Sequence, residues 1–208
     1  MPMIEKISMN IATVIFEQKQ LNRLDYLKTK LGLEILLINL TKGLLVYGVA
    51  LVVGTLFQTL VTHLAYSLMR RVSFGLHAKS SLNCTLISLI MFVAIPFLAQ
   101  NVVINNFIVT PIFIICIACF YRFAPASTEK NPLVGAKRRK RLKTQSVLFC
   151  AGIMVFVLLI PFPMVKVLMT LGVIMQTIWI LPITYKILKR SRKSYEQYEI
   201  ENMESIAE

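Results

Sequence analysis

Long apolar runs separated by short basic segments make up most of this chain. Four runs, at 84–99, 102–120, 146–160 and 164–188, are interpreted as membrane crossings, because about 20 apolar residues in a helix span the hydrocarbon core. Several of them are short or contain a proline or asparagine, so breaks in the helices are expected. The pattern predicts an all-α, polytopic integral membrane protein.

The first 69 residues allow more than one arrangement. Residues 1–42 mix charged side chains with isoleucine and valine at helical spacing, which predicts an amphipathic helix lying in the membrane interface. The apolar run 43–69 either crosses once, or residues 33–69 form two tight crossings or a re-entrant hairpin. We prefer the second arrangement, which gives about six membrane segments, with three weak points at Gly43, Gly48 and Gly54.

Composition supports this class of protein. The 208 residues are 56% hydrophobic with a mean hydropathy of +0.68, as expected for a single membrane domain over 1–208 rather than a soluble protein. The net charge of +13 is concentrated between the apolar runs instead of along a soluble face. Anionic membrane lipid and an acidic peptide are therefore the expected partners, and nucleic acid is not.

The basic clusters also predict a topology. They lie between Arg70 and Lys79, between Arg122 and Lys143, and between Lys186 and Lys193. Two of the four crossings lie between the first and second clusters and two between the second and third, so all three clusters lie on one side of the membrane. The positive-inside rule assigns that side to the cytoplasm.

The polar segment 70–84 carries the candidate chemistry. It contains His77 and, seven residues later, Cys84, the two side chains that a thiol nucleophile mechanism requires. On one continuous helix they would lie roughly 10 Å apart along the axis, too far for a hydrogen bond. We therefore expect a turn at Gly75 and a new helix capped by Ser81, with the thiol in its first turn, where the helix dipole favours a thiolate.

The remaining histidine and the three remaining cysteines are expected to have structural roles. Cys116 and Cys119 have the spacing of a redox or zinc motif but lie in an apolar run without a second ligand pair, and Cys150 is isolated. His63 lies within an apolar run, where an interhelical hydrogen bond is the expected role. No cofactor or metal is predicted. On spacing alone, a histidine and a cysteine in such positions are more often an interfacial residue and a packing residue than a catalytic pair.

Two sequence motifs resemble those of a known protein family. The segment Arg-Arg-x-x-x-Gly-x-His-Ala-x-Ser-Ser-x-x-Cys at 70–84 and the block Ala-Pro-Ala-x-Thr-x-x-x-Pro at 124–132 resemble the accessory gene regulator protein B family, membrane cysteine peptidases of Gram-positive quorum sensing. Both motifs occur in the right order in a chain of suitable length and hydropathy. Phe74 stands where many distant members carry another glycine.

The resemblance implies a function and roles. His77 would be the base and Cys84 the nucleophile, while Arg70 and Gly75 match motif positions around them. The expected substrate is a small propeptide with an amphipathic leader and an acidic C-terminal tail. Its tail would be cleaved through a Cys84 thioester, and an internal Cys or Ser of the peptide would close a thiolactone or lactone ring. The catalytic loop would lie at the cytoplasmic face of the cell membrane.

Supporting roles and rival functions remain open. Arg70 and five further basic residues are candidates to bind the propeptide tail, although basic residues that flank a membrane helix more often fix topology. The five are Lys137, Arg138, Arg139, Lys140 and Arg141. A membrane thioacyltransferase would use the same Cys and His chemistry on lipid acyl groups. A peptide transporter or binding subunit would need the basic segments without chemistry. A homodimer is also left open.

Overall fold

Helices joined by short connections form the described part of the chain. The computed structural model describes residues 7, 9–11, 13–15, 22–76, 81–128, 133–192, 195–196 and 200. The helices are α2 (Arg23–Val53), α3 (Leu56–Ser73), α4 (Ser81–Leu89), the π-helical turn η1 (Ile90–Ala94), α5 (Ile95–Ala99), α6 (Asn106–Phe123), α7 (Ala136–Leu159), α8 (Pro163–Ile180) and α9 (Pro182–Ile187). Within these residues the only β pairing is one isolated bridge.

Five helical stretches of the described residues are long and apolar enough to cross a membrane. They are α2, the stretch Leu82–Ala99, α6, α7 and α8. Helix α3 has 18 residues but does not belong to this set. The prediction of an all-α, multi-pass membrane protein is confirmed.

The chain divides into two units, Met1–Val53 and Gly54–Glu208. In the first unit, α2 continues through Gly43 and Gly48 and ends at Val53. Of the three expected weak points, only Gly54 ends a helix, where its φ of +78° suits glycine. A single uninterrupted helix over 43–69 is therefore excluded.

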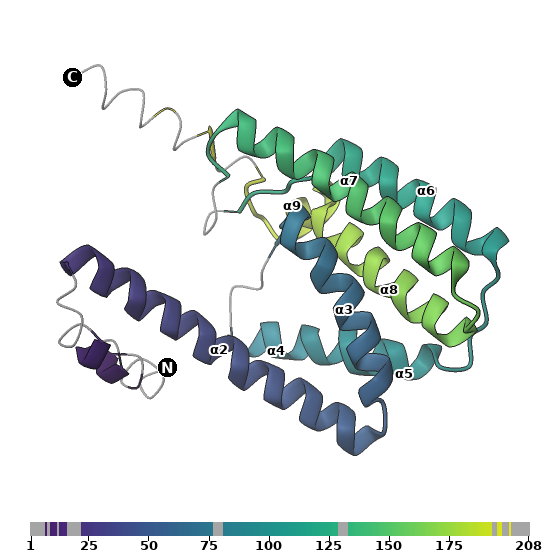
Figure 1. The fold of residues 1–208 in the computed structure, drawn as a ribbon, viewed down its shortest axis with the longest axis horizontal. Coiled ribbons are helices and arrows are strands. Elements are labelled where there is room, and N and C mark those ends of the chain that lie inside the picture. Colours follow the sequence, from purple (N-terminus) through teal and green to yellow (C-terminus); the bar gives the residue numbers. More distant parts are fainter. Residues whose placement is uncertain are drawn as a thin grey trace. The chain divides into compact units, whose positions relative to one another are not determined.

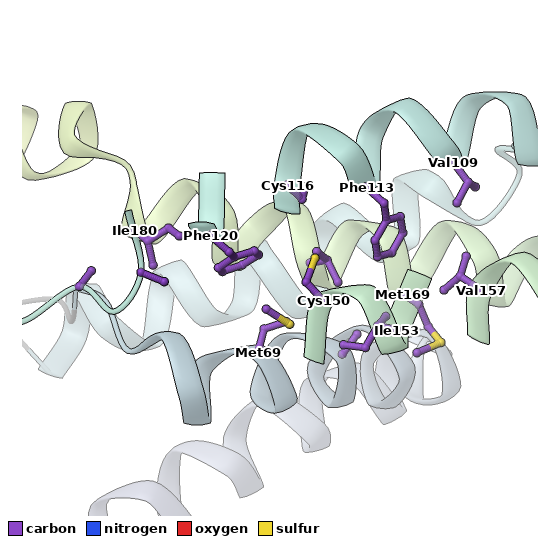
Figure 2. Close-up of a cluster of buried hydrophobic side chains, with 14 of the residues drawn as sticks. Met69, Val109, Phe113, Cys116, Phe120, Cys150, Ile153, Val157, Met169 and Ile180 are labelled. Atoms are coloured by element: carbon purple, nitrogen blue, oxygen red, sulfur yellow. The ribbon is translucent and has the colours of Figure 1, made fainter. Parts of the chain in front are cut away.

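In the second unit, α8 packs against α3, α5, α6 and α7. Over half of α8 is buried, 56% against 22% in the matching stretches of α6 and α7. The core between these helices is formed by residues such as Met69, Phe113, Cys150 and Met169 (Figure 2). Cys116 also belongs to it, as expected for a packing cysteine.

Helices α3 and α8 approach each other closely at Gly172. A Cβ atom at this position would lie 2.6 Å from the Thr62 carbonyl oxygen and 2.8 Å from the Ala65 Cβ. Real Cβ atoms do not come so close to backbone atoms, so this crossing requires glycine. Small residues at helix contacts are typical of membrane proteins, because they let backbones pack closely.

The helix that begins at Ser81 contains a π-helical turn near its middle. Pro96 has no amide hydrogen to donate to the Phe92 carbonyl four residues earlier, as an α-helix would require. The hydroxyl of the buried Thr59, from α3, donates to this carbonyl instead. The irregular backbone is therefore satisfied by a neighbouring helix, as a membrane interior demands.

Three helix limits differ from those expected from hydropathy. Helix α6 begins at Asn106, because the side chain of Asn105 caps it by accepting from the Ile108 amide at 3.1 Å. Helix α8 ends at Ile180, since Pro182 favours an extended conformation at Leu181. Helix α7 begins at Ala136, ten residues before the expected crossing, so the basic run 137–143 is helical rather than a loop.

Most basic residues of the second unit gather at one end of the helix bundle. The C-terminal ends of α3, α6 and α8 meet there with the N-terminal end of α7 (Figure 1). Among the described residues of this unit, Lys166 alone carries positive charge near the other end, where it donates to Asn106 Oδ1. The described members of the three clusters expected on one side of a membrane thus share one end of the bundle.

Candidate functional site

The chain turns sharply at the end of α3. We call the segment Ser73–Leu76, which starts with the last residue of that helix, the α3 turn. Phe74 has φ 56° and ψ −140°, and Gly75 has φ +117°. A Cβ on Gly75 would lie 3.1 Å from the Trp179 carbonyl oxygen. Both the backbone conformation and the lack of space therefore explain the glycine.

The α3 turn pairs with the second sequence motif. Ala126 donates its amide to the Ser73 carbonyl at 2.9 Å and accepts from the Gly75 amide at 3.1 Å, forming a parallel bridge between Phe74 and Ala126. Residues about 50 positions apart in the sequence are thus joined backbone to backbone. The two segments that carry the family resemblance form one site.

Arg70 holds the α3 turn from within its own helix. Its Nη2 donates to the Gly75 carbonyl at 3.1 Å and to the Leu76 carbonyl at 2.6 Å. Its Nη1 donates to Gln176 Oε1 at 3.4 Å. The guanidinium is thus engaged with the backbone that leads into residue 77, and binding of a substrate carboxylate by Arg70 stays a prediction.

The Ala-Pro-Ala loop, residues 124–128, is itself fixed by the chain beyond α8. The Tyr185 hydroxyl donates to the Ser127 carbonyl at 3.1 Å, and Arg192 donates to the Phe123 carbonyl. The Ser127 hydroxyl donates in turn to the Arg192 carbonyl. Burial raises the pKa of Tyr185 to about 12, so its hydroxyl remains a donor at neutral pH. The Ala124–Pro125 peptide bond is cis.

Cys84 lies in the first part of α4. The helix begins at Ser81, so the cysteine is its fourth residue, one position later than a Ser81 cap would give. Its side chain is partly exposed, and its carbonyl accepts from the Ser88 hydroxyl at 2.8 Å. His77 lies outside the described residues, and its pairing with Cys84 stays a prediction.

Helix α3 presents aromatic and basic side chains to the helix that carries the thiol. The His63 ring lies 4.5 Å from the Phe92 ring, and the Tyr66 ring meets Phe92 edge-on at 5.1 Å. The Arg70 guanidinium carbon lies 5.7 Å from the Tyr66 ring centre. Helix α3 thus packs against the π-helical turn Ile90–Ala94, which follows the helix of Cys84.

The described residues of the segment 70–84 include one partly exposed thiol, Cys84. Among the described residues, no group of three or more His, Cys, Asp or Glu side chains could hold a metal ion. A partly exposed thiol is a candidate nucleophile, and that role for Cys84 stays a prediction.

Comparison with known proteins identifies the family. The model of the accessory gene regulator B family matches residues 8–180. The chain belongs to this family. It is 51% identical over 174 residues to an AgrB-like protein of Listeria innocua, covering 84% of this chain and 85% of that protein.

Two more distant relatives match over more of the chain. An AgrB-like protein of Clostridium acetobutylicum is 37% identical over 196 residues, 94% of each chain. The accessory gene regulator protein B of Staphylococcus epidermidis is 34% identical over 185 residues, 89% of this chain and 94% of that protein. No solved structure matches. The resemblance inferred from the two motifs is confirmed.

In this AgrB family member the basic run 137–143 has two kinds of side chain. Arg139 is part of the structure, because it donates to the Leu133 carbonyl at 3.0 Å and stacks 4.0 Å from the Tyr195 ring centre. Four others are exposed at the start of α7: Lys137, Arg138, Lys140 and Arg141. Their binding of a propeptide stays a prediction, and the contacts of Arg139 make it the member least suited to that role.

Sequence reasoning missed Gln176, which is fully buried in α8. Its amide contacts the end of α3, the α3 turn and Arg70. The available signal was a single glutamine within the apolar run 164–188, since a strongly polar residue inside a membrane helix usually has a specific partner.

Proposed function

We propose that this AgrB family protein is a membrane cysteine endopeptidase that processes a quorum-sensing propeptide. It would cleave the acidic C-terminal tail through Cys84 and promote cyclisation of the remaining peptide. The observation that carries the proposal is the backbone pairing of the α3 turn with Ala126, which joins the first family motif to the second. Family membership supports the same function.

The chemistry requires two acyl transfers. His77 takes the Cys84 thiol proton, the thiolate attacks the scissile carbonyl, and the carbon–nitrogen bond breaks as the leaving amine accepts that proton. A thioester to Cys84 results. An internal thiol of the peptide then loses its proton to His77 and attacks the thioester, which releases the Cys84 thiol and closes a thiolactone. An internal hydroxyl would give a lactone, and water a linear acid.

Substrate capture would use the charge gathered at this end of the bundle. The acidic propeptide tail would approach the exposed basic side chains of α7, at the membrane surface that its amphipathic leader also contacts. A cytoplasmic position for this end follows from the positive-inside rule, and it would place the site where a propeptide is made.

The first test removes the thiol. Cys84→Ala should abolish propeptide cleavage by the purified protein in lipid discs, and His77→Ala should do the same. Cys119→Ala is the matched control, since Cys119 is also a partly exposed membrane-helix cysteine, and it should keep wild-type cleavage. Full cleavage by the Cys84 variant would overturn the proposed nucleophile.

Trapping distinguishes this function from its rivals. Acid-quenched wild-type protein incubated with propeptide should carry the peptide as a hydroxylamine-sensitive thioester on Cys84, detected by mass spectrometry. A fatty acyl group on Cys84 would identify a thioacyltransferase. A transported peptide without any adduct or cleavage would identify a transporter. Either result would replace the peptidase.

The second test concerns capture by α7. Replacing Lys137, Arg138, Lys140 and Arg141 together by glutamine, while keeping the structural Arg139, should raise KM for cleavage at least tenfold with little change in kcat. Each basic residue near an anionic group contributes on the order of 1 kcal/mol before screening by salt. The measurement is made in neutral-lipid discs.

A propeptide whose acidic tail is neutralised provides the control. It should bind wild-type protein weakly and lose nothing further in the α7 variant. Equal losses with both tails would show that these residues serve the membrane rather than the peptide.

A further inference from the structure

Gln176 occupies a buried position where α8 passes the end of α3. Its side chain is 0% exposed. The amide nitrogen donates to the Ser73 hydroxyl oxygen at 2.8 Å and to the Phe74 carbonyl, and the amide oxygen accepts from Arg70 at 3.4 Å. One side chain thus contacts the last residue of α3, the α3 turn and the arginine that supports that turn.

The orientation of this amide is decided by its partners. A guanidinium can only donate and a carbonyl can only accept, so the oxygen of Gln176 must face Arg70 and the nitrogen must face Phe74. The Ser73 hydroxyl already donates to the Met69 carbonyl at 2.7 Å, which leaves its lone pairs to accept from Gln176. Neither a carboxylate nor an apolar side chain could satisfy all three partners.

Trp179, one helical turn further along α8, forms hydrogen bonds to the chain on either side of the segment 77–84. Its carbonyl accepts from the Leu76 amide at 3.5 Å, on the N-terminal side of residue 77. Its indole nitrogen donates to the Met91 sulfur at 3.2 Å, in the helix that carries Cys84. The C-terminal part of α8 therefore contacts the chain both before His77 and after Cys84.

We propose that Gln176 is a positioning residue for the cysteine chemistry, and this inference rests on the proposed function. By holding Ser73, Phe74 and Arg70, it sets where the chain leaves α3 and so where the following residues, including His77, meet the thiol. Gln176 itself touches no reacting atom. Its loss lets the α3 turn shift, and a displacement of about 1 Å at a reacting group can cost about 100-fold in rate.

Two substitutions test this role. Gln176→Met keeps the length of the side chain but removes every hydrogen bond, and Gln176→Glu keeps the shape but replaces both amide donors with acceptors. Thr170→Val is the matched control, because Thr170 is a buried polar residue of the same helix whose hydroxyl donates only to the Lys166 carbonyl, within α8.

The first measurement does not depend on activity. Hydrogen exchange of the full-length protein in lipid discs should be at least about tenfold faster at the amides of Gly75 and Leu76 in both Gln176 variants, and unchanged in α6 and α7. These two amides are bonded to Ala126 and Trp179 in the intact turn. Thr170→Val should exchange as wild type does at the α3 turn.

The second measurement separates positioning from binding and from general stability. Both Gln176 variants should lower kcat for propeptide cleavage by about 10- to 100-fold with KM within about twofold of wild type. Thr170→Val should keep kcat. If Gln176→Met does not insert into the membrane, the shape-conserving Gln176→Glu decides the question.

Each result has one meaning. Unchanged exchange at the α3 turn, or faster exchange with wild-type kcat, overturns the positioning role. A change in KM alone also overturns it. If the wild-type protein cleaves no propeptide, the proposed function fails, and the exchange comparison still decides whether Gln176 holds the turn.

Discussion

Gly75 permits the α3 turn by having no side chain. Its φ of +117° is unfavourable for any residue with a Cβ, and a Cβ there would lie 3.1 Å from the Trp179 carbonyl oxygen, closer than most such contacts. The two constraints are independent, since one concerns the backbone of the turn and the other its contact with α8. A substitution there must distort the turn or push it away from α8.

Gly75→Ala should therefore lower propeptide cleavage at least tenfold, because about 1 to 3 kcal/mol of backbone strain is released by moving the turn. Gly135→Ala is the control, since Gly135 also has a positive φ of +95° but a Cβ added there would meet no atom within 4 Å. It should keep cleavage within about threefold. Wild-type cleavage by Gly75→Ala would show that the tight turn is not required.

Arg70 and Gln176 belong to one hydrogen-bonded cluster, but only Arg70 was identified as a candidate site residue from the sequence. Arg70 stands in a motif beside other polar residues, whereas Gln176 is surrounded by apolar ones. In the structure they contact each other and hold the same turn. Their shared role depends on packing between α3 and α8.

Among the helices, α8 organises the second unit, and its contact with α3 is set at Gly172. The close approach of the two backbones at this point brings Gln176, one helical turn further along α8, to the end of α3. Packing at Gly172 and polar contacts at Gln176 therefore belong to one interface. A substitution at Gly172 should therefore lower the stability of the protein.

Gly172→Ala should lower the free energy of unfolding by about 1 to 3 kcal/mol, because the added methyl group overlaps backbone atoms of α3. Unfolding in detergent can be followed by the fluorescence of Trp179, the single tryptophan of the chain. Gly152→Ala in α7 is the control.

A Cβ at Gly152 would meet nothing within 4 Å, so this second substitution gains helix propensity of up to about 1 kcal/mol without a clash. It should leave stability equal or slightly higher. If the two variants lost the same stability, close packing of α3 against α8 would not be the cause.

Across the whole second unit, charge is distributed unequally between the two ends. The described basic clusters lie at the end that contains the α3 turn, while Lys166 lies near the opposite end. A membrane protein with this asymmetry is expected to place its basic end in the cytoplasm. The proposed site would then face the compartment in which a propeptide is synthesised.

Cysteine labelling tests this orientation. In a background lacking the four native cysteines, Gly135→Cys and Lys186→Cys should react with an impermeant maleimide only in inverted membranes, whereas Asn101→Cys should react in intact cells. All three positions are exposed. Labelling of position 135 from outside would contradict both the topology and the route proposed for the substrate.

Several features of this protein follow from the sequence alone, because they depend on local composition. Runs of apolar residues produce helices that cross a membrane, and basic residues between the runs bias their orientation. The two motifs at 70–84 and 124–132 were sufficient to indicate the family, which the comparisons confirm. The nucleophile and base are single positions within the first motif, and their roles stay predictions.

Helix limits were less predictable, because hydropathy does not report them. Lysine and arginine are good helix formers, so α7 begins at Ala136, well before its apolar part. Glycine is tolerated within a helix, so Gly43 and Gly48 remain helical, while Gly54 adopts a positive φ and ends α2.

The geometry of the site was decided only by tertiary structure. Pairing of Phe74 with Ala126 and bonding of Gln176 to Ser73 join residues 52 and 103 positions apart. These contacts arise because α8 packs against α3 while the chain after α6 returns to the same end of the bundle. A sequence specifies which side chains can donate and accept, whereas the packing of helices determines which of them meet.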